Sequence, residues 1–512
     1  MTLPVTVPFH DDETPLSLAS RLAIANGYRS LADFLHYTYI RHTAIRRGEE
    51  NAMANLSEWS GVPVNKLARY AASRKIPTWR LGNAVFSSSS RCGYRQRFCA
   101  ECLRADFENG EGRPESRAYA RASWQVGAFS ACIIHNCTLS ELKGTRDDDG
   151  DFSRLVWANK AEILNTTPTS ASPQALRVSE YITARLVGAT SNDFLDSLQA
   201  YVALDMCTYL GHFAKKHQIV EQSMMSAPDM EVGFDIARNG LRAVTKACSE
   251  AVSKAQPRHN GHRHFFRRIW VWLYSHKDKA DFKPVVDIFQ GIAEYNFPLG
   301  PHDVFLLNSG PQKVHSLKSA AAKWGMSSEH VRTVLEDAGL IEKSKLTPAY
   351  FMFDAVKADE ILGNQAAAMT VQEVSREWGL PIDRVRNLIR NGFLPSLPRS
   401  GRRGITIMLP RDKFKDIKKR VDGPKVSSDE LQGWTRVTDV KSYGRSLDGV
   451  LELIRTKKLA AVRCGGDELR HLWVKRTDLF EKTSAGCATK KVRLPYRDDY
   501  GLNARIKKRR KI

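Results

Sequence analysis

Residues 324–335 read WGMSSEHVRTVL, and residues 378–389 read WGLPIDRVRNLI. The two stretches align without a gap at an offset of 54 residues, which is 378 minus 324. A third copy, residues 443–454, reads YGRSLDGVLELI and needs a slip of one residue upstream of its glycine. An internal repeat of this kind indicates that one supersecondary unit is used several times in the C-terminal half.

Each copy carries the same order of local signals. A cap-type residue begins a short first helix; these residues are Ser316, Thr370 and Thr435. An aromatic residue followed by glycine then ends that helix, because glycine adopts the positive φ of a tight turn without strain. The second helix begins at a serine or proline, namely Ser327, Pro381 and Ser446. This order is the plan of a helix-turn-helix unit, whose second helix can lie in a major groove.

Each copy also ends in a short extended stretch, in residues 350–354, 405–410 and 472–475. We expect wing-like hairpins at these places, and residues 399–404 (RSGRRG) suit the turn between two such strands. The C-terminal half is therefore expected to contain tandem winged helix-turn-helix modules.

The second copy has the side chains best suited to DNA, because Arg and Asn can contact phosphates and base edges. We expect DNA contacts from the second helix of this copy and from the turn that follows it: Arg384, Arg386, Asn387, Arg390, Arg402 and Arg403. The first copy offers less basic candidates: His330, Arg332 and Thr333. In the third copy, Asp448 and Glu452 favour a protein contact at least as much as a DNA contact. The alternative for all three copies is a packing module that touches no DNA.

The chain as a whole is strongly basic. Its 512 residues contain 78 Lys+Arg and 56 Asp+Glu, a formal net charge of +22 at pH 7. Such a balance favours a polyanionic partner, with nucleic acid ahead of an anionic membrane. The run 505–511 cannot be buried, and we expect this tail to bind phosphates through side chains that include Lys507, Lys508, Arg509 and Arg510.

The sequence also indicates the compartment. No stretch reaches the roughly 18 apolar residues that span a bilayer, and residues 1–12 lack the pattern of a secretory signal. We therefore expect an intracellular protein, cytoplasmic and associated with the nucleoid. Its nine cysteines do not form a disulfide framework, so they are expected to be thiols or metal ligands.

Two pairs of residues have the spacing of metal ligands. Cys99 and Cys102 form a C-x-x-C pair, and Cys132 and His135 form a C-x-x-H pair. Three thiolates and one imidazole make a closed tetrahedral zinc site, so we expect one structural Zn²⁺ with no open position for catalysis. Two further cysteines lie close enough in sequence to be substitute ligands: Cys92 and Cys137.

These signals predict a mainly α, multi-domain chain. We expect an N-terminal domain with a zinc knuckle over 1–150 and a helical middle region over 151–310. Helix-turn-helix modules follow over 311–362, 363–425 and 430–482, and a basic tail over 483–512. Within the middle region, residues 263–273 mix basic and aromatic side chains. They form either a buried helix with arginines on its solvent face or a contact for nucleic acid or a partner.

A set of short motifs covers the N-terminal part. They are residues 15–18, 20–23, 26–27, 98–103 with Asp106, 119–121, Trp124, and 132–135 with Leu139. Over residues 1–150 these motifs resemble the TniQ/TnsD family of transposon target-selection proteins. The chain departs from the family where Ala100 and Ile133 replace the usual prolines, and where residues 140–143 replace a second C-x-x-C.

The resemblance implies a non-enzymatic protein that recognises a target site in double-stranded DNA. It further implies recruitment of the transposon's AAA+ ATPase, a TnsC- or TniB-like protein, and through it the transposase, with no membrane and no small-molecule substrate. Two alternatives remain: a zinc-containing transcription regulator with several helix-turn-helix modules, and a non-specific assembly scaffold. An enzyme is disfavoured because the sequence shows no phosphate-binding Gly-Lys-Ser/Thr loop and no distinct pair of carboxylates.

Overall fold

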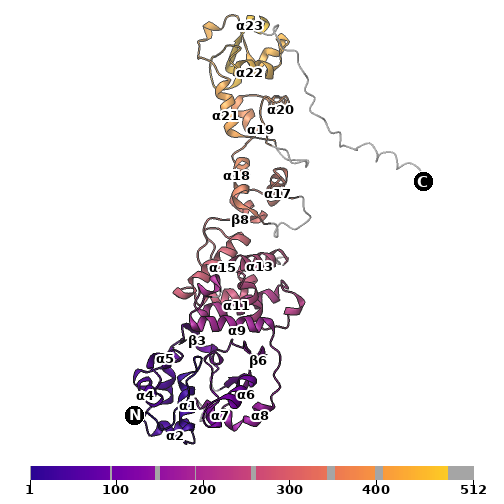
Figure 1. Ribbon diagram of the computed structural model, residues 1–512. Helices are drawn as coiled ribbons and strands as arrows, with labels where there is room; N and C mark the ends of the chain where they lie inside the picture. Colours follow the sequence, from indigo (N-terminus) through magenta and orange to yellow (C-terminus); the bar gives the residue numbers. More distant parts are fainter. Residues whose placement is uncertain are drawn as a thin grey trace, which may run out of the picture. The chain divides into compact units, whose positions relative to one another are not determined.

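A computed structural model describes residues 2–92, 95–144, 150–190, 192–254, 261–342, 352–397 and 407–481. The chain is mainly helical and divides into two compact units, Met1–Val314 and His315–Ile512 (Figure 1). The prediction of a mainly α chain with several parts is confirmed. Within the described residues, no helix has the length and apolar character needed to cross a membrane.

The first part of the N-terminal unit combines short helices with small antiparallel sheets. Its helices are α1 (Pro15–Ala25), α2 (Leu31–His36), α3 (His42–Arg47), α4 (Glu50–Ser60), α5 (Val64–Ala68) and α6 (Ala100–Asn109). Its strands are β1 (Ser73–Lys75), β2 (Thr78–Leu81), β3 (Ala84–Ser87), β4 (Arg95–Phe98), β5 (Ala131–Cys132), β6 (Cys137–Thr138) and β7 (Ser140–Lys143). Strand β2 pairs with both β1 and β3, β4 pairs with β7, and β5 pairs with β6.

Helix α1 lies in the core of this first part. It starts where the Thr14 hydroxyl accepts a hydrogen bond from the Ser17 amide, with Pro15 in the first turn, as cap chemistry favours. Arg21 of this helix is buried, and its guanidinium donates to Glu13 Oε2 at 2.8 Å and to the Ser116 carbonyl at 2.7 Å. The buried arginine therefore ties α1 to the chain that follows α6.

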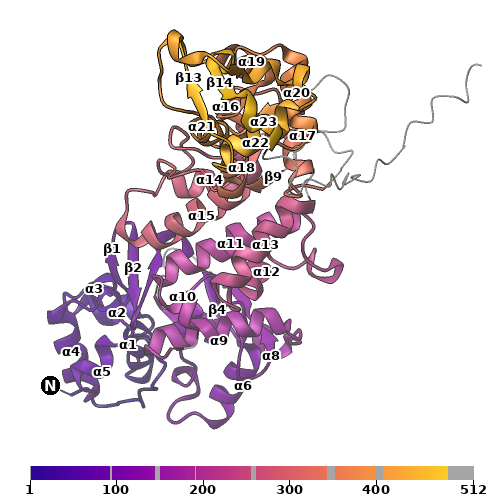
Figure 2. The ribbon, with the colours of Figure 1, turned by 90° about the horizontal axis from the view of Figure 1, so that it is seen from above.

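The rest of the N-terminal unit is helical (Figure 2). Its helices are α7 (Phe152–Ala158), α8 (Lys160–Asn165), α9 (Pro173–Val187), α10 (Asp193–Asp196), α11 (Ala200–Lys216), α12 (Asp229–Ala237), α13 (Leu241–Lys254), α14 (His262–Tyr274) and α15 (Lys283–Asn296). Helices α11 and α12 cross in direct backbone contact at Gly211 and Gly233. A Cβ at either glycine would overlap a carbonyl oxygen of the other helix.

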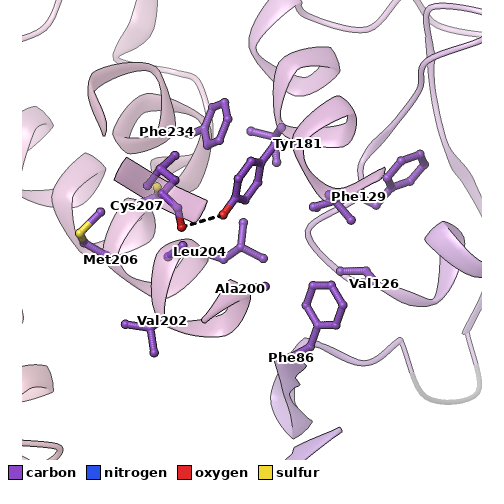
Figure 3. Close-up of a cluster of buried hydrophobic side chains, with 14 of the residues drawn as sticks. Phe86, Val126, Phe129, Tyr181, Ala200, Val202, Leu204, Met206, Cys207 and Phe234 are labelled. Carbon is purple, nitrogen blue, oxygen red and sulfur yellow. Dashed lines mark hydrogen bonds between the residues drawn. The ribbon is translucent and has the colours of Figure 1, made fainter. Parts of the chain in front are cut away.

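One hydrophobic cluster extends through this unit from Tyr70 to Leu306. It includes the cysteines of the two predicted ligand pairs together with residues of the β1–β3 sheet and of the helices from α7 to α15. Figure 3 shows part of it, in which the Tyr181 hydroxyl donates to the Leu195 carbonyl at 3.2 Å. The metal-type cysteines are thus embedded in the core that also carries the helical middle region.

The C-terminal unit repeats one order of elements three times. The first copy is β8 (Val314–Ser316), α16 (Leu317–Trp324), α17 (Ser328–Asp337), β9 (Met352–Asp354) and α18 (Ala355–Ala366). The second is β10 (Met369–Thr370), α19 (Val371–Trp378), α20 (Ile382–Arg390), β11 (Met408–Leu409) and α21 (Arg411–Arg420). The third is β12 (Trp434–Arg436), the 3₁₀ helix η9 (Val437–Tyr443), α22 (Leu447–Arg455), β13 (Ala461–Arg463), β14 (Leu472–Lys475) and α23 (Arg476–Glu481).

The last strand of each copy pairs with the strand that precedes its first helix: β9 with β8, β11 with β10, and β14 with β12. In the third copy β14 is also the antiparallel neighbour of β13, so these two strands form a hairpin where a wing is expected. In the described residues of the first two copies, the closing strand pairs only with the strand at the start of its own copy. The turn predicted at 399–404 lies outside the described residues.

The turns between the paired helices have the geometry expected from the sequence. Gly325, Gly379 and Gly444 have φ values of 63°, 62° and 71°, in the left-handed region that glycine tolerates best. Ser316 and Thr370 cap the first helices in capping boxes. In the third copy the capping position is Arg436, one residue after the expected Thr435, and the first helix is 3₁₀. The slip in the alignment of this copy therefore corresponds to a local difference in structure.

The three copies do not have three separate cores. The first copy buries its own cluster, from Leu317 to Leu362. The second and third copies share a single cluster that runs from Met369 to Leu479 and includes the fully buried Trp378.

Candidate metal centre and nucleic-acid interface

The two predicted ligand pairs lie on different elements that the fold brings together. Cys99 is the residue that precedes α6, and Cys102 lies in the first turn of that helix. Cys132 ends β5, and His135 lies in the turn to β6. The C-x-x-C pair is thus presented at the start of a helix, and the C-x-x-H pair by a short hairpin.

The donor atoms of the four side chains form a compact group. All four lie within 4.8 Å of one another, with the cysteines buried and the histidine exposed. His135 Nδ1 is 3.3 Å from Cys102 Sγ, 3.5 Å from Cys99 Sγ and 3.6 Å from Cys132 Sγ. Three sulfurs and one imidazole nitrogen are a donor set that zinc prefers in closed structural sites. The residues present therefore fit the zinc ion that the sequence predicts.

A fourth thiol lies beside this group. Cys137 lies directly across the β5–β6 hairpin from Cys132, and its sulfur is 3.4 Å from that of Cys99. Cys92, the other substitute ligand that the sequence allowed, points elsewhere, with its sulfur 3.6 Å from the Trp124 carbonyl oxygen. Only Cys137 of these two is therefore placed to act as a substitute ligand.

The environment of the group shifts the pKa values of its thiols in opposite directions. Hydrogen bonds with the thiols of Cys102 and Cys132 lower the pKa of Cys99. Hydrogen bonds with Cys132 and Cys99, together with burial, raise the pKa of Cys102, and the charge of Arg121 acts in the opposite direction. Burial and the neighbouring Cys99 also raise the pKa of Cys137. Arg121 is itself buried, and the Asp106 carboxylate raises its pKa against the effect of burial.

Arg121 also explains why several of the N-terminal motif residues occur together. Its two terminal nitrogens donate to the two carboxylate oxygens of Asp106, each at 2.9 Å. Its guanidinium lies 4.0 Å from the ring centre of Tyr119 and 4.7 Å from that of Trp124. The bidentate ion pair and the two cation–π contacts hold Arg121 in one geometry, from which its charge acts on Cys102.

The second helix of the second copy, α20, exposes the residues predicted to contact DNA. Val385 and Leu388 are buried, whereas Arg384, Arg386, Asn387 and Arg390 are exposed. Arg384 donates to the Thr438 carbonyl at 2.8 Å, which links α20 to the third copy. The Arg386 guanidinium lies 3.4 Å from Asp383, and that of Arg390 donates to the Asn387 side chain at 3.2 Å.

The first copy differs from its prediction at one residue. Thr333 of α17 is buried, and its hydroxyl donates to the Glu329 carbonyl one turn earlier at 2.8 Å. The position faces the packed side of the helix, which is unfavourable for the expected DNA contact from Thr333. His330 and Arg332 are partly exposed. The other predicted contacts lie outside the described residues: Arg402, Arg403, Lys507, Lys508, Arg509 and Arg510.

Sequence reasoning did not find the interactions that join these residues to distant parts of the chain. Two examples are the hydrogen bond from Arg384 to Thr438 and the effect of the Arg121 charge on Cys102. Both depend on contacts between residues far apart in the sequence. The spacing C-x-x-H-x-C in residues 132–137 was the one local signal that could have favoured Cys137 over Cys92.

The chain thus combines a Cys/His group of zinc type in the first unit with repeated helix pairs in the second, on a mainly helical fold. Residues 4–139 match the family model described as TniQ, and this stretch contains all four ligand residues and Cys137. The chain therefore carries a TniQ domain, and the resemblance to the TniQ/TnsD family is confirmed. A search of the curated proteins found no match.

Proposed function

We propose that this protein selects the target site for transposition by binding a specific sequence in double-stranded DNA, and that it then recruits the AAA+ ATPase of the element. The TniQ domain supports a role in transposition that involves DNA binding or target selection. The transposase is engaged through the ATPase, and this chain itself acts as a non-enzymatic adaptor.

The observation that carries the DNA-binding part is the outer face of α20. This helix exposes Arg386 and Asn387 beside two further arginines, while Val385 and Leu388 fix it in the core. The helix follows a tight glycine turn, the arrangement in which helix-turn-helix proteins insert the second helix into a major groove. Asn387 suits adenine and Arg386 suits guanine, each worth about 1–3 kcal/mol of discrimination between bases.

The metal centre supports this role indirectly. Zinc bound by Cys99, Cys102, Cys132 and His135 would supply folding free energy to the TniQ domain, since the closed donor set leaves no position for a substrate. The TniQ domain is then a rigid surface on which the ATPase can dock. The basic tail at 505–511 adds contacts to phosphates without reading the sequence.

The test begins with footprinting of genomic fragments, with and without the neighbouring ATPase, to find the target. The variant Arg386→Ala/Asn387→Ala should then lose affinity for that target far more than for random duplex. The matched control is Gln372→Ala/Arg376→Ala, which removes two exposed side chains of the same kinds from α19 of the same copy. Equal losses on the two DNAs would show that α20 binds only phosphates.

The same experiment separates the alternatives. A transcription regulator would protect operator sequences and would not bind the ATPase. An assembly scaffold would bind the ATPase and show no preference among DNA sequences. Sequence-specific protection that persists when the ATPase joins the complex is the result expected for a target selector.

A further inference from the structure

Helix α14 of the N-terminal unit carries an unbalanced charge. Residues 251–277, which include this helix, contain six Lys or Arg, four His and no Asp or Glu. The structure buries one face of the helix and exposes the other. The buried residues are Phe265, Phe266, Ile269, Trp272 and Leu273, and the exposed residues between them include His264, Arg267 and Arg268. The helix is thus firmly packed and presents two arginines and a histidine to solvent.

A hollow of about 410 Å³ lies between these side chains and the end of α11. Its polar lining consists of Tyr209, His212, Lys216, Arg267 and Arg268. The rings of Phe213, Phe265 and Phe266 supply its apolar part. Three cations from two helices that are far apart in the sequence therefore border one concave surface.

These cations lack acidic partners. In the part of the chain that the structure describes, Lys216, Arg267 and Arg268 form no ion pair, and Arg268 has a ring nitrogen of His212 at 3.3 Å as its hydrogen-bond partner. The nearby carboxylate of Asp229 contacts Lys215 at 2.8 Å and His212 Nδ1 at 3.4 Å. Partial burial and the charge of Arg267 lower the pKa of Lys216, as expected for cations that repel one another.

A group of like charges around a hollow is stabilised by an anion, and arginine suits phosphate because it can donate two parallel hydrogen bonds. His264 lies one helical turn before Arg268, so the surface is elongated. An elongated basic surface matches a linear polyanion better than a single small ion. Its aromatic residues are largely buried, which disfavours the stacking of unpaired bases.

We propose that the surface formed by Lys216, Arg267 and Arg268 binds the phosphate backbone of duplex DNA without reading its sequence. This inference rests on the proposed function, because it adds a second DNA contact to a protein whose C-terminal unit reads the target. The N-terminal unit would then hold DNA directly, and affinity would be divided between the two units.

The test uses the full chain and measures binding to a labelled random-sequence duplex over a series of salt concentrations. The logarithm of the affinity falls linearly with the logarithm of the salt concentration, and each lost phosphate contact makes this slope shallower by about 0.9. Lys216→Ala/Arg267→Ala should therefore make the slope shallower by about 1.8 and should reduce the affinity for target and random duplex by the same factor. Lys216→Arg/Arg267→Lys, which keeps both charges, should retain most of the slope.

The matched control is Arg242→Ala/Lys246→Ala, which removes one arginine and one lysine from the exposed positions of α13 and should leave the slope unchanged. Zinc content and thermal unfolding show that each variant is folded. A test variant that keeps the wild-type slope, or that loses only single-stranded RNA binding, overturns this inference while the proposed function stands. A wild-type protein that binds no duplex DNA overturns both.

Discussion

The candidate metal centre has four predicted ligands and one further thiol beside them, that of Cys137. Its sulfur lies 3.4 Å from that of Cys99, opposite Cys132 in the hairpin. A thiolate is a better zinc ligand than a solvent molecule, so a thiol this close can replace a missing donor with a small movement of the hairpin.

We expect His135→Ala to retain most of its zinc, because Cys137 completes the donor set. His135→Ala/Cys137→Ala should lose the metal, as should Cys99→Ala. Cys92→Ala is the control and should keep full zinc, since its sulfur contacts the Trp124 carbonyl oxygen instead. The measurement is the zinc-to-protein ratio after extensive dialysis. If His135→Ala loses as much zinc as Cys99→Ala, Cys137 is not a substitute ligand.

The buried ion pair between Arg21 and Glu13 has a distinct pH dependence. Burial raises the pKa of Glu13 to about 7, although Arg21 acts in the opposite direction. A carboxyl whose pKa is raised by folding favours the folded state below its unfolded value, and this contribution is lost as the pH rises through about 7. Removal of the arginine leaves a buried carboxylate without its cation only where that carboxyl is ionised.

We therefore expect Arg21→Met to reduce the free energy of unfolding by about 3–5 kcal/mol at alkaline pH and by clearly less at mildly acidic pH. Urea unfolding at the two pH values measures both losses relative to the wild type. Arg238→Met is the control, because its pair with Asp235 is exposed and contributes little at either pH. A loss that does not change with pH would mean that Glu13 stays ionised when Arg21 is absent.

At the scale of elements, the crossing of α11 and α12 depends on two glycines. Neither helix needs glycine for its own backbone, and glycine inside a helix costs about 0.5–1 kcal/mol relative to alanine. The close approach requires it, because a Cβ at Gly211 would overlap the carbonyl oxygen of Asp229. The crossing brings α12 close enough for Asp229 to pair with Lys215 beside the basic hollow.

Gly211→Ala should lower the free energy of unfolding by about 1–3 kcal/mol or more, because the helices must separate. Gly291→Ala in α15 is the control, since a Cβ there would meet nothing within 4 Å and the helix should gain propensity. Chemical unfolding of both variants makes the comparison. Equal stability of the two variants would contradict the close crossing of α11 and α12.

At the scale of the whole molecule, every ligand of the proposed zinc lies in the N-terminal unit, and the C-terminal unit has its own buried clusters. Removal of the metal should therefore affect the two units differently. The free energy of zinc binding is folding free energy for the unit that holds the ligands.

We expect calorimetry to show two unfolding transitions. A zinc chelator should lower the midpoint temperature of one transition and leave that of the other unchanged. Cys99→Ala should reproduce the effect of the chelator without any chelator present. The midpoint temperature of the C-terminal transition should stay the same in both cases. It should be lowered instead by a change in the core shared by the second and third copies, such as Trp378→Ala. If chelation shifts both transitions together, the units do not unfold independently.

The sequence by itself determined the features that depend on neighbours along the chain. The ligand pairs Cys99/Cys102 and Cys132/His135 follow from their spacing, and the turns at Gly325, Gly379 and Gly444 follow from the conformational freedom of glycine. The division of α20 into buried and exposed residues follows from helical periodicity. Each of these depends on interactions over a few residues, so a local pattern contains the information.

The tertiary structure alone decided which distant residues meet. It paired β9 with β8 and β11 with β10, it directed Thr333 inward, and it chose Cys137 over Cys92 beside the metal ligands. It also gave the second and third copies one core, and it placed Lys216 close enough to Arg267 for their charges to interact. These contacts join residues that are far apart in the sequence, and their partners are selected by packing of the whole core, which no local pattern contains.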